Sequence, residues 1–232
     1  MPEIFSNTTL TVNQLIEKID TGELGLPELQ RPFIWKDSKV RDLFDSMMRG
    51  YPIGYLMLWE CPSLDKKKSI GVDAHSYDSP KEVIIDGQQR LTTVSLLFLA
   101  MYNLIEKKII VPQEPSLAQQ LYEDFLVDKY QPQETRIKLK PVKNDSKAFG
   151  KLFDEDGEHI QNSNLTVNYN YFYDRIQRGE ISIDELFDAI CRLEIISIQL
   201  SQDDNPQLIF ESLNSTGLAL SEGDKIRNFI LM

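Results

Sequence analysis

The chain has 232 residues, and its 41% hydrophobic and 26% charged content is typical of a globular protein with a sizeable core. Its 25 basic and 36 acidic residues give a formal net charge of −11. This charge argues against a general DNA clamp, because nonspecific DNA binding depends on neutralising phosphates. No run of about 18 apolar residues is present, so we expect no membrane span.

Capping signals, apolar periodicity and proline positions predict alternating helices and strands along the chain. The expected elements of the first half are a helix over 11–19, an extended segment over 26–35, a helix over 37–49, a strand over 55–59, a strand over 82–85 and a helix over 91–107. Those of the second half are a helix over 117–127, a strand over 135–139, mainly helices over 144–178, a helix from 182, a strand over 193–200 and helices from 205 and 221.

This order of elements predicts an α/β (α+β) fold with a small mixed sheet and surrounding helices. We expect residues 1–110 to form the core, residues 111–192 a mainly helical insertion, and residues 193–232 a returning strand and helices that complete the core. The last helix is still apolar where the sequence stops, so we expect the natural protein to continue into a C-terminal domain.

The string from Asp86 to Arg90, Asp-Gly-Gln-Gln-Arg, follows a short apolar strand and opens a helix. A structural interpretation makes Asp86 the N-cap and Gln89 its capping-box partner, which leaves Gln88 and Arg90 unexplained. A functional interpretation places an anion at the helix N-terminus, where backbone N–H groups lack partners. Arg90 favours this second interpretation, because the helix dipole disfavours a cation there. The sequence leaves both open.

Two threonines in the first helical turn, Thr92 and Thr93, extend the candidate site. A second candidate is Gln30-Arg31, where a stiff extended segment would present a guanidinium fork to a phosphate or carboxylate. In the same segment, Phe33 and Trp35 are better explained as aromatic residues that cover the core.

A third candidate lies near the C-terminal end, at Asn214, Arg227 and Asn228. A capped corner between two helices explains Asn214, whereas Arg227 and Asn228 lie on an otherwise apolar helix and are less well explained. The chain has no glycine-rich Walker loop. Its 2 histidines and 2 cysteines are also too few for a histidine-rich HNH nuclease site or a nucleophile–histidine pair.

Together these blocks resemble the N-terminal domain of GmrSD-type modification-dependent restriction enzymes. The resemblance rests on Leu-Pro through Gln-Arg-Pro-Phe-Ile-Trp at 26–35, Gly-Tyr-Pro-Ile-Gly at 50–54, Ile-Asp-Gly-Gln-Gln-Arg-Leu-Thr-Thr at 85–93, and the blocks at 209–217 and 227–228. It implies a ParB/sulfiredoxin-like core and a site that binds and hydrolyses a nucleoside triphosphate.

The resemblance also implies roles for the motif residues. Asp86 would hold a divalent cation, most simply Mg²⁺, or orient the attacking water, with Arg90 and Gln89 beside it as catalytic residues. The residues that would bind nucleotide or phosphate are Gln30, Arg31, Gly87, Gln88, Thr92, Thr93, Asn214, Arg227 and Asn228. Acid, amides and arginines suffice for phosphoryl transfer, which depends mostly on positioning and charge stabilisation.

Family members usually carry a C-terminal HNH nuclease domain, which this sequence lacks. We therefore expect a regulatory NTPase in a phage-defence system, partnered by an HNH-type nuclease domain or subunit located elsewhere. Modified DNA would be bound only locally, a homodimer is compatible with the sequence, and we expect no membrane partner. The absence of a secretory signal and the distant cysteines favour a cytoplasmic location.

Two other functions remain open from the sequence. The same pocket could read a nucleotide or a DNA phosphate without hydrolysing it. Alternatively, a ParB-like domain could cut DNA itself. That function would need a metal pair, and nothing in the chain beyond Asp86 supplies an obvious one, so it ranks last. Glu82 lies four residues before Asp86, a spacing that puts both acids on one face of a strand.

Overall fold

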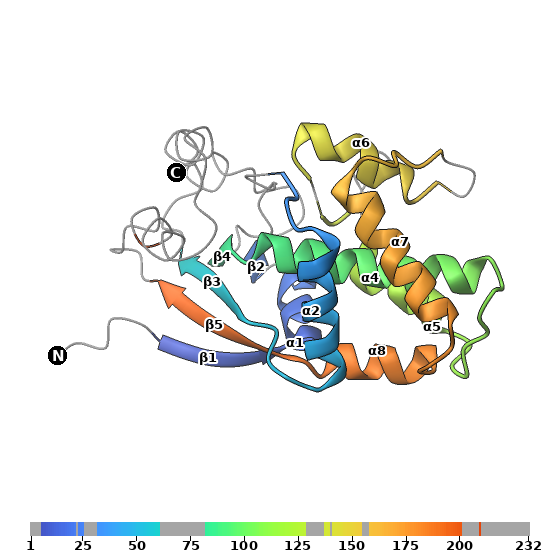
Figure 1. Ribbon diagram of the computed structural model, residues 1–232. Helices are drawn as coiled ribbons and strands as arrows, with labels where there is room; N and C mark the ends of the chain where they lie inside the picture. The colour runs from blue at the N-terminus through green and yellow to red at the C-terminus, as the bar shows by residue number, and fades with distance from the viewer. Residues whose placement is uncertain are drawn as a thin grey trace.

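The computed structural model describes residues 6–21, 23–25, 32–60, 82–128, 137–139, 141–154, 158–200 and residue 209. The predicted α/β class is confirmed: a five-stranded mixed sheet in the order β1-β5-β3-β4-β2 is combined with helices that gather toward one side of the molecule (Figure 1). The strands are β1 (Ser6–Thr11), β2 (Leu24–Gly25), β3 (Tyr55–Glu60), β4 (Glu82–Asp86) and β5 (Glu194–Leu200). The helices are α1 (Val12–Asp20), α2 (Asp37–Met48), α4 (Gln88–Glu106), α5 (Leu117–Gln120), the π-helix η1 (Leu121–Leu126), α6 (Lys143–Lys151), α7 (Asn164–Gln177) and α8 (Ile183–Cys191).

The sheet is mixed because each of its three inner strands, β5, β3 and β4, has one parallel and one antiparallel neighbour. Strand β3 is antiparallel to β4 and parallel to β5, while β1 is antiparallel to β5 and β2 is parallel to β4. The carboxyl end of β4 leads through a single residue, Gly87, into α4, the longest of the described helices. This junction carries the motif.

The two faces of the sheet contribute to different hydrophobic clusters. Leu56, Leu58 and Ile84 join the large core that the helices build around α4. Met57 and Ile85 belong to a smaller cluster on the opposite face. The sequence alternation along β3 therefore separates a helix-covered face from a second face.

The local sequence signals predicted several boundaries correctly. Capping boxes begin α1 at Thr11 and α8 at Ser182, as expected. Helix α2 also begins at Asp37 as expected, although the sequence's candidate caps, Asp37 and Ser38, are not used: Lys36 is the N-cap residue and makes no side-chain capping bond. The strands over 6–11 and 24–25 were not predicted, since their polar or very short sequences carry no period-two pattern.

Most of residues 111–192 that the structure describes are helical, as expected for the insertion. A strand was predicted over 135–139. The structure describes residues 137–139 of it, and these form no strand but one isolated bridge, between Ile137 and Val127. Side chains of this segment and of residues 1–110 share one hydrophobic core, and Phe98 of α4 packs against Phe125 and Phe187. The domain boundaries remain a prediction.

The helices predicted from 205 and 221 lie outside the described residues, apart from Ile209, which is helical. Among the helices that are described, none combines the length and the apolar character needed to cross a membrane.

Candidate functional site

The motif lies where β4 ends and α4 begins, and Gly87 makes this junction possible. Its φ of 107° is in the left-handed region that favours glycine. A Cβ at this position would lie 2.2 Å from Leu56 Cδ2 of the neighbouring strand. Conformation and space therefore both require glycine here, and α4 begins in close contact with β3.

A register shift between β3 and β4 decides which way Asp86 faces. Leu58 pairs with Ile84, so an unbroken antiparallel ladder would pair Asp86 with Leu56; instead it pairs with Met57. Directly opposed residues share a face of the sheet. The irregularity therefore turns Asp86 to the face of Met57 and Tyr55, away from the helix-covered core.

Tyr55 joins Asp86 and Arg90 into one polar cluster. Burial raises the pKa of the Tyr55 hydroxyl, and the negative charge of Asp86 and a hydrogen bond to its carboxylate raise that pKa further, while Arg90 opposes the effect. Arg90 lies with its guanidinium carbon 4.8 Å from the centroid of the Tyr55 ring and donates from Nη1 to the Tyr55 carbonyl at 2.7 Å. The Asp86 side chain is buried, with 6% of its surface exposed, whereas Arg90 is half-buried.

Gly54 provides the space in which Arg90 lies. Its φ is 112°, and a Cβ there would be 2.7 Å from Arg90 Nε. The Gly54 carbonyl also accepts the Ile196 N–H of β5 at 3.1 Å, which fixes the backbone beneath the guanidinium. Tyr55 and Gly54 were not among the predicted site residues. The Gly-Tyr-Pro-Ile-Gly string at 50–54 was noted for the resemblance, and its second glycine is the signal that could have identified them.

The capping-box interpretation of Asp86 and Gln89 is wrong. Gly87 is the N-cap residue of α4 and, as a glycine, makes no side-chain capping bond. The amide of Gln89 instead binds the backbone of the preceding extended segment: its Oε1 accepts the Ile34 N–H at 3.0 Å and its Nε2 donates to the Pro32 carbonyl at 3.0 Å. Gln88 is buried beside it, with 5% of its surface exposed.

Thr92 and Thr93 face the interior of the molecule. Both are 0% exposed, and their hydroxyls donate at 2.8 Å to the carbonyls of Gln88 and Gln89, one helical turn earlier. The structure thus shows both hydroxyls bonded within the first turns of α4, and nucleotide binding by these threonines stays a prediction.

The other predicted phosphate ligands are Gln30, Arg31, Asn214, Arg227 and Asn228. All five lie outside the described residues. Their role in binding nucleotide or phosphate thus stays a prediction. Phe33 and Trp35, next to this block, are placed as expected: Phe33 is part of the hydrophobic core and Trp35 packs against it.

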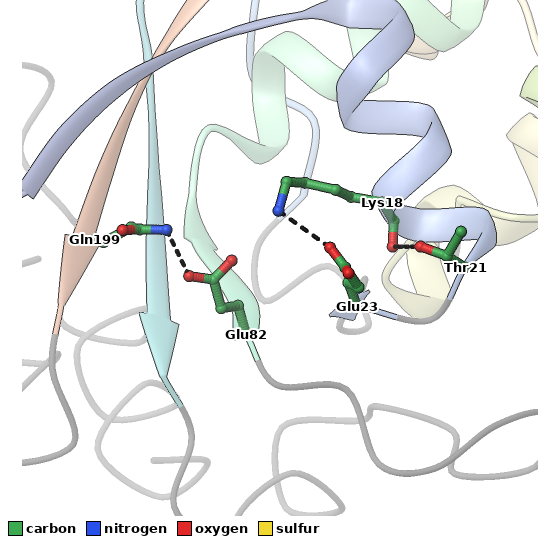
Figure 2. Close-up of polar contacts among 5 residues, drawn as sticks. All are labelled: Lys18, Thr21, Glu23, Glu82 and Gln199. Carbon is green, nitrogen blue, oxygen red and sulfur yellow. Dashed lines mark hydrogen bonds and ion pairs between the residues drawn. The ribbon is translucent and has the colours of Figure 1, made fainter.

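Glu82, the other acid of β4, lies at the opposite end of the strand from the motif and accepts a hydrogen bond there. Gln199 of β5 reaches past β3 and donates from Nε2 to its carboxylate at 2.7 Å, as Figure 2 shows. Because the register shift turns Asp86 to the opposite face, the prediction that these two acids share a face is wrong. The described residues contain no cluster of three or more His, Cys, Asp or Glu side chains suited to a metal ion.

Comparisons with known proteins identify the family. The chain is 25% identical, over 94% of its length, to an uncharacterized protein of Methanocaldococcus jannaschii, and it spans about two fifths (41%) of that relative. The family model of the GmrSD restriction endonuclease N-terminal domain matches residues 12–231. This match covers nearly the whole chain and includes every motif described above. The chain therefore belongs to the family of GmrSD restriction endonuclease N-terminal domains.

Proposed function

We propose that this chain is an NTP-binding and NTP-hydrolysing domain that regulates a nuclease located elsewhere in a modification-dependent restriction system. Family membership supports a role in a restriction system. The observation that carries the hydrolytic part is the cluster of Asp86, Tyr55 and Arg90 at the N-terminus of the 19-residue helix α4.

A phosphate chain suits this place for two reasons. The first-turn N–H groups and the dipole of a long helix favour an anion at its N-terminus. Arg90 is held in place over the Tyr55 ring, with its guanidinium carbon 4.8 Å from the ring centroid, and donates from Nη1 to the Tyr55 carbonyl. A guanidinium fixed in this way is preorganised for a phosphate, which a flexible lysine would not be.

Asp86 supplies the negative charge of the site. Magnesium in nucleotide sites is usually bound through one or two carboxylates together with phosphate oxygens and water, so a single buried aspartate fits it. When bound, Mg²⁺ would neutralise phosphate charge. Tyr55 would hold the Asp86 carboxylate in place through its hydroxyl, and Asp86 would orient the attacking water. Gly87 and the first-turn backbone, with Gln88, would contact phosphate oxygens.

The partners follow from the same proposal. We propose that an HNH-type nuclease domain or subunit receives the signal of nucleotide turnover, and that modified DNA contacts this domain at a local site. A cytoplasmic location and a homodimeric state are compatible with this role. Because the chain spans 41% of its relative, these partners belong to the proposal for the whole protein.

The test is release of inorganic phosphate from ATP and from GTP with magnesium. We expect Asp86→Ala and Arg90→Ala each to lower kcat/KM by about a hundredfold, as removal of one charge-stabilising group does in other enzymes. Tyr55→Phe keeps the ring under Arg90 and removes the hydroxyl, so we expect it to lower kcat more than it changes KM. The exposed residues Asp174 and Arg178 provide matched controls, Asp174→Ala and Arg178→Ala. Equal phosphate release by all six proteins would refute the hydrolytic function.

A non-catalytic sensor is the second candidate, favoured by the buried, largely structural role of Gln89, which was expected to take part in catalysis. Isothermal titration calorimetry separates the two. Binding of ATP or GTP that depends on Arg90, without phosphate release, would establish the sensor instead of the hydrolase.

A further inference from the structure

The extended segment 32–35 belongs to no strand, and side chains rather than a neighbouring strand satisfy its backbone. On one side lies Gln89, the fourth residue of the motif. Its amide oxygen accepts the Ile34 N–H and its amide nitrogen donates to the Pro32 carbonyl, both at 3.0 Å. Both ends of this amide are thereby used, and Gln89 is 3% exposed.

On its other side the segment is held by α6 and α7. Asp145 of α6 accepts the Phe33 N–H at 2.6 Å. Asn164 of α7 donates to the Phe33 carbonyl at 3.3 Å, and Asn168 of α7 donates to the Trp35 carbonyl at 2.8 Å. Five backbone groups of a short segment are thus bound by four side chains from three helices.

These bonds form a chain of contacts from α6 to the motif. Asp145 binds the N–H of Phe33, the residue between the two that Gln89 binds, and no hydrogen bond joins Asp145 to Gln89 directly within the described residues. Loss of a bond to a buried N–H leaves that group unsatisfied, which favours a shift of the whole segment. A shift of the segment would move Gln89, which is bonded to it, and with Gln89 the first turn of α4, which also contains Arg90.

We infer that Asp145 is a positioning residue for the motif: through the segment 32–35 it fixes Gln89 and the start of α4. The helices of residues 141–177 thereby hold the site in its working geometry without contacting a ligand. The consequence for catalysis rests on the proposed function, whereas the mechanical coupling does not.

Amide hydrogen exchange, followed by NMR on the nucleotide-free protein, tests the coupling. We expect Asp145→Ala to speed exchange about tenfold, the effect of one charged hydrogen bond, at Ile34 as well as at Phe33, and to shift the side-chain amide resonances of Gln89. Asp145→Asn keeps an acceptor oxygen and should restore most of the protection. The control is Asp42→Ala, at an exposed aspartate of α2. If Asp145→Ala changes Phe33 alone, the inference is wrong.

Phosphate release from ATP and GTP with magnesium tests the consequence. We expect Asp145→Ala to lower kcat/KM about tenfold, Asp145→Asn to recover it, and Asp42→Ala to match wild type. Asp145→Ala combined with Gln89→Ala should cost little more than either change, because both act through one segment. Unchanged kcat/KM in Asp145→Ala would refute the positioning role. Inactive wild-type protein would refute the proposed function and leave the coupling to be decided by the exchange data.

Discussion

At the scale of single residues, two glycines, Gly54 and Gly87, set the geometry of the site. Each has a positive φ and a neighbour that a Cβ would strike: Arg90 Nε in one case and Leu56 Cδ2 in the other. Gly54 makes room for a flexible side chain, so a substitution there would move Arg90. Gly87 contacts a packed leucine of the core, so a substitution there would strain the fold itself.

Gly87→Ala should therefore destabilise the protein strongly. We expect a loss of about 3 kcal/mol in the free energy of unfolding, from left-handed backbone strain together with overpacking against Leu56. Gly179→Ala is the matched control, because its φ is 68° and a Cβ there meets nothing within 4 Å. This control should cost about 1 kcal/mol. Urea unfolding curves measure both, and equal losses in the two variants would contradict the steric argument.

The motif residues divide by function once their neighbours are known. Asp86 and Arg90 meet Tyr55 and remain candidates for chemistry, whereas Gln89 binds backbone and the two threonines bind their own helix. The sequence could indicate a strand-to-helix junction with an acid and an arginine. It could not separate these roles, because the partners of Gln89 lie 55 and 57 positions away.

At the scale of elements, α4 connects the site to the helical segment. Its first turn carries the motif, and its C-terminal part packs against α7. Asn103 of α4 donates from Nδ2 to the Tyr169 hydroxyl of α7 at 2.8 Å and to the Leu152 carbonyl at 3.0 Å. Tyr169 is 2% exposed, and burial raises the pKa of its hydroxyl to about 12. This buried contact ties the helical segment to the helix that begins at the site.

The raised pKa of Tyr169 predicts a specific pH dependence of stability. Because the folded-state pKa of about 12 exceeds the unfolded value of 10.0, its contribution is complete below pH 10 and is lost as the pH rises toward 12. Over that range we expect the free energy of unfolding to fall by about 2 to 3 kcal/mol more in wild type than in Tyr169→Phe. Urea unfolding from pH 9 to about pH 12 measures it. Tyr51→Phe, at an exposed tyrosine, should follow wild type; parallel curves for all three proteins would contradict the assignment.

The elements that carry capping boxes or strong periodicity, such as α1, α8 and β5, were predictable because their signals are local. The strand β1 was not, since its Ser-Asn-Thr-Thr-Leu-Thr sequence gains its strand pairing from β5, far away in the chain. The irregularity between β3 and β4 was equally unpredictable. It is a property of the strand pair, and it reverses the face expected for Asp86.

At the scale of the whole molecule, the net charge of −11 limits what the protein can bind. We expect unmodified duplex DNA to bind with a Kd weaker than about 10⁻⁴ M at 0.15 M salt, because an acidic surface releases few counterions from phosphates. Fluorescence anisotropy of a labelled duplex between 50 and 200 mM salt measures this. Micromolar affinity with a steep salt dependence would show that a basic surface dominates binding despite the net charge.

The sequence by itself determined the α/β class, the main helices and the position of the motif at a strand-to-helix junction, because these follow from periodicity and capping within short windows. It also determined the family, since the motif blocks lie in order along the chain. Only the tertiary structure decided that Tyr55 completes the cluster with Asp86 and Arg90, and that Gln89 holds the segment 32–35. Those contacts join residues distant in sequence, and their geometry comes from strand pairing and helix packing that no local pattern encodes.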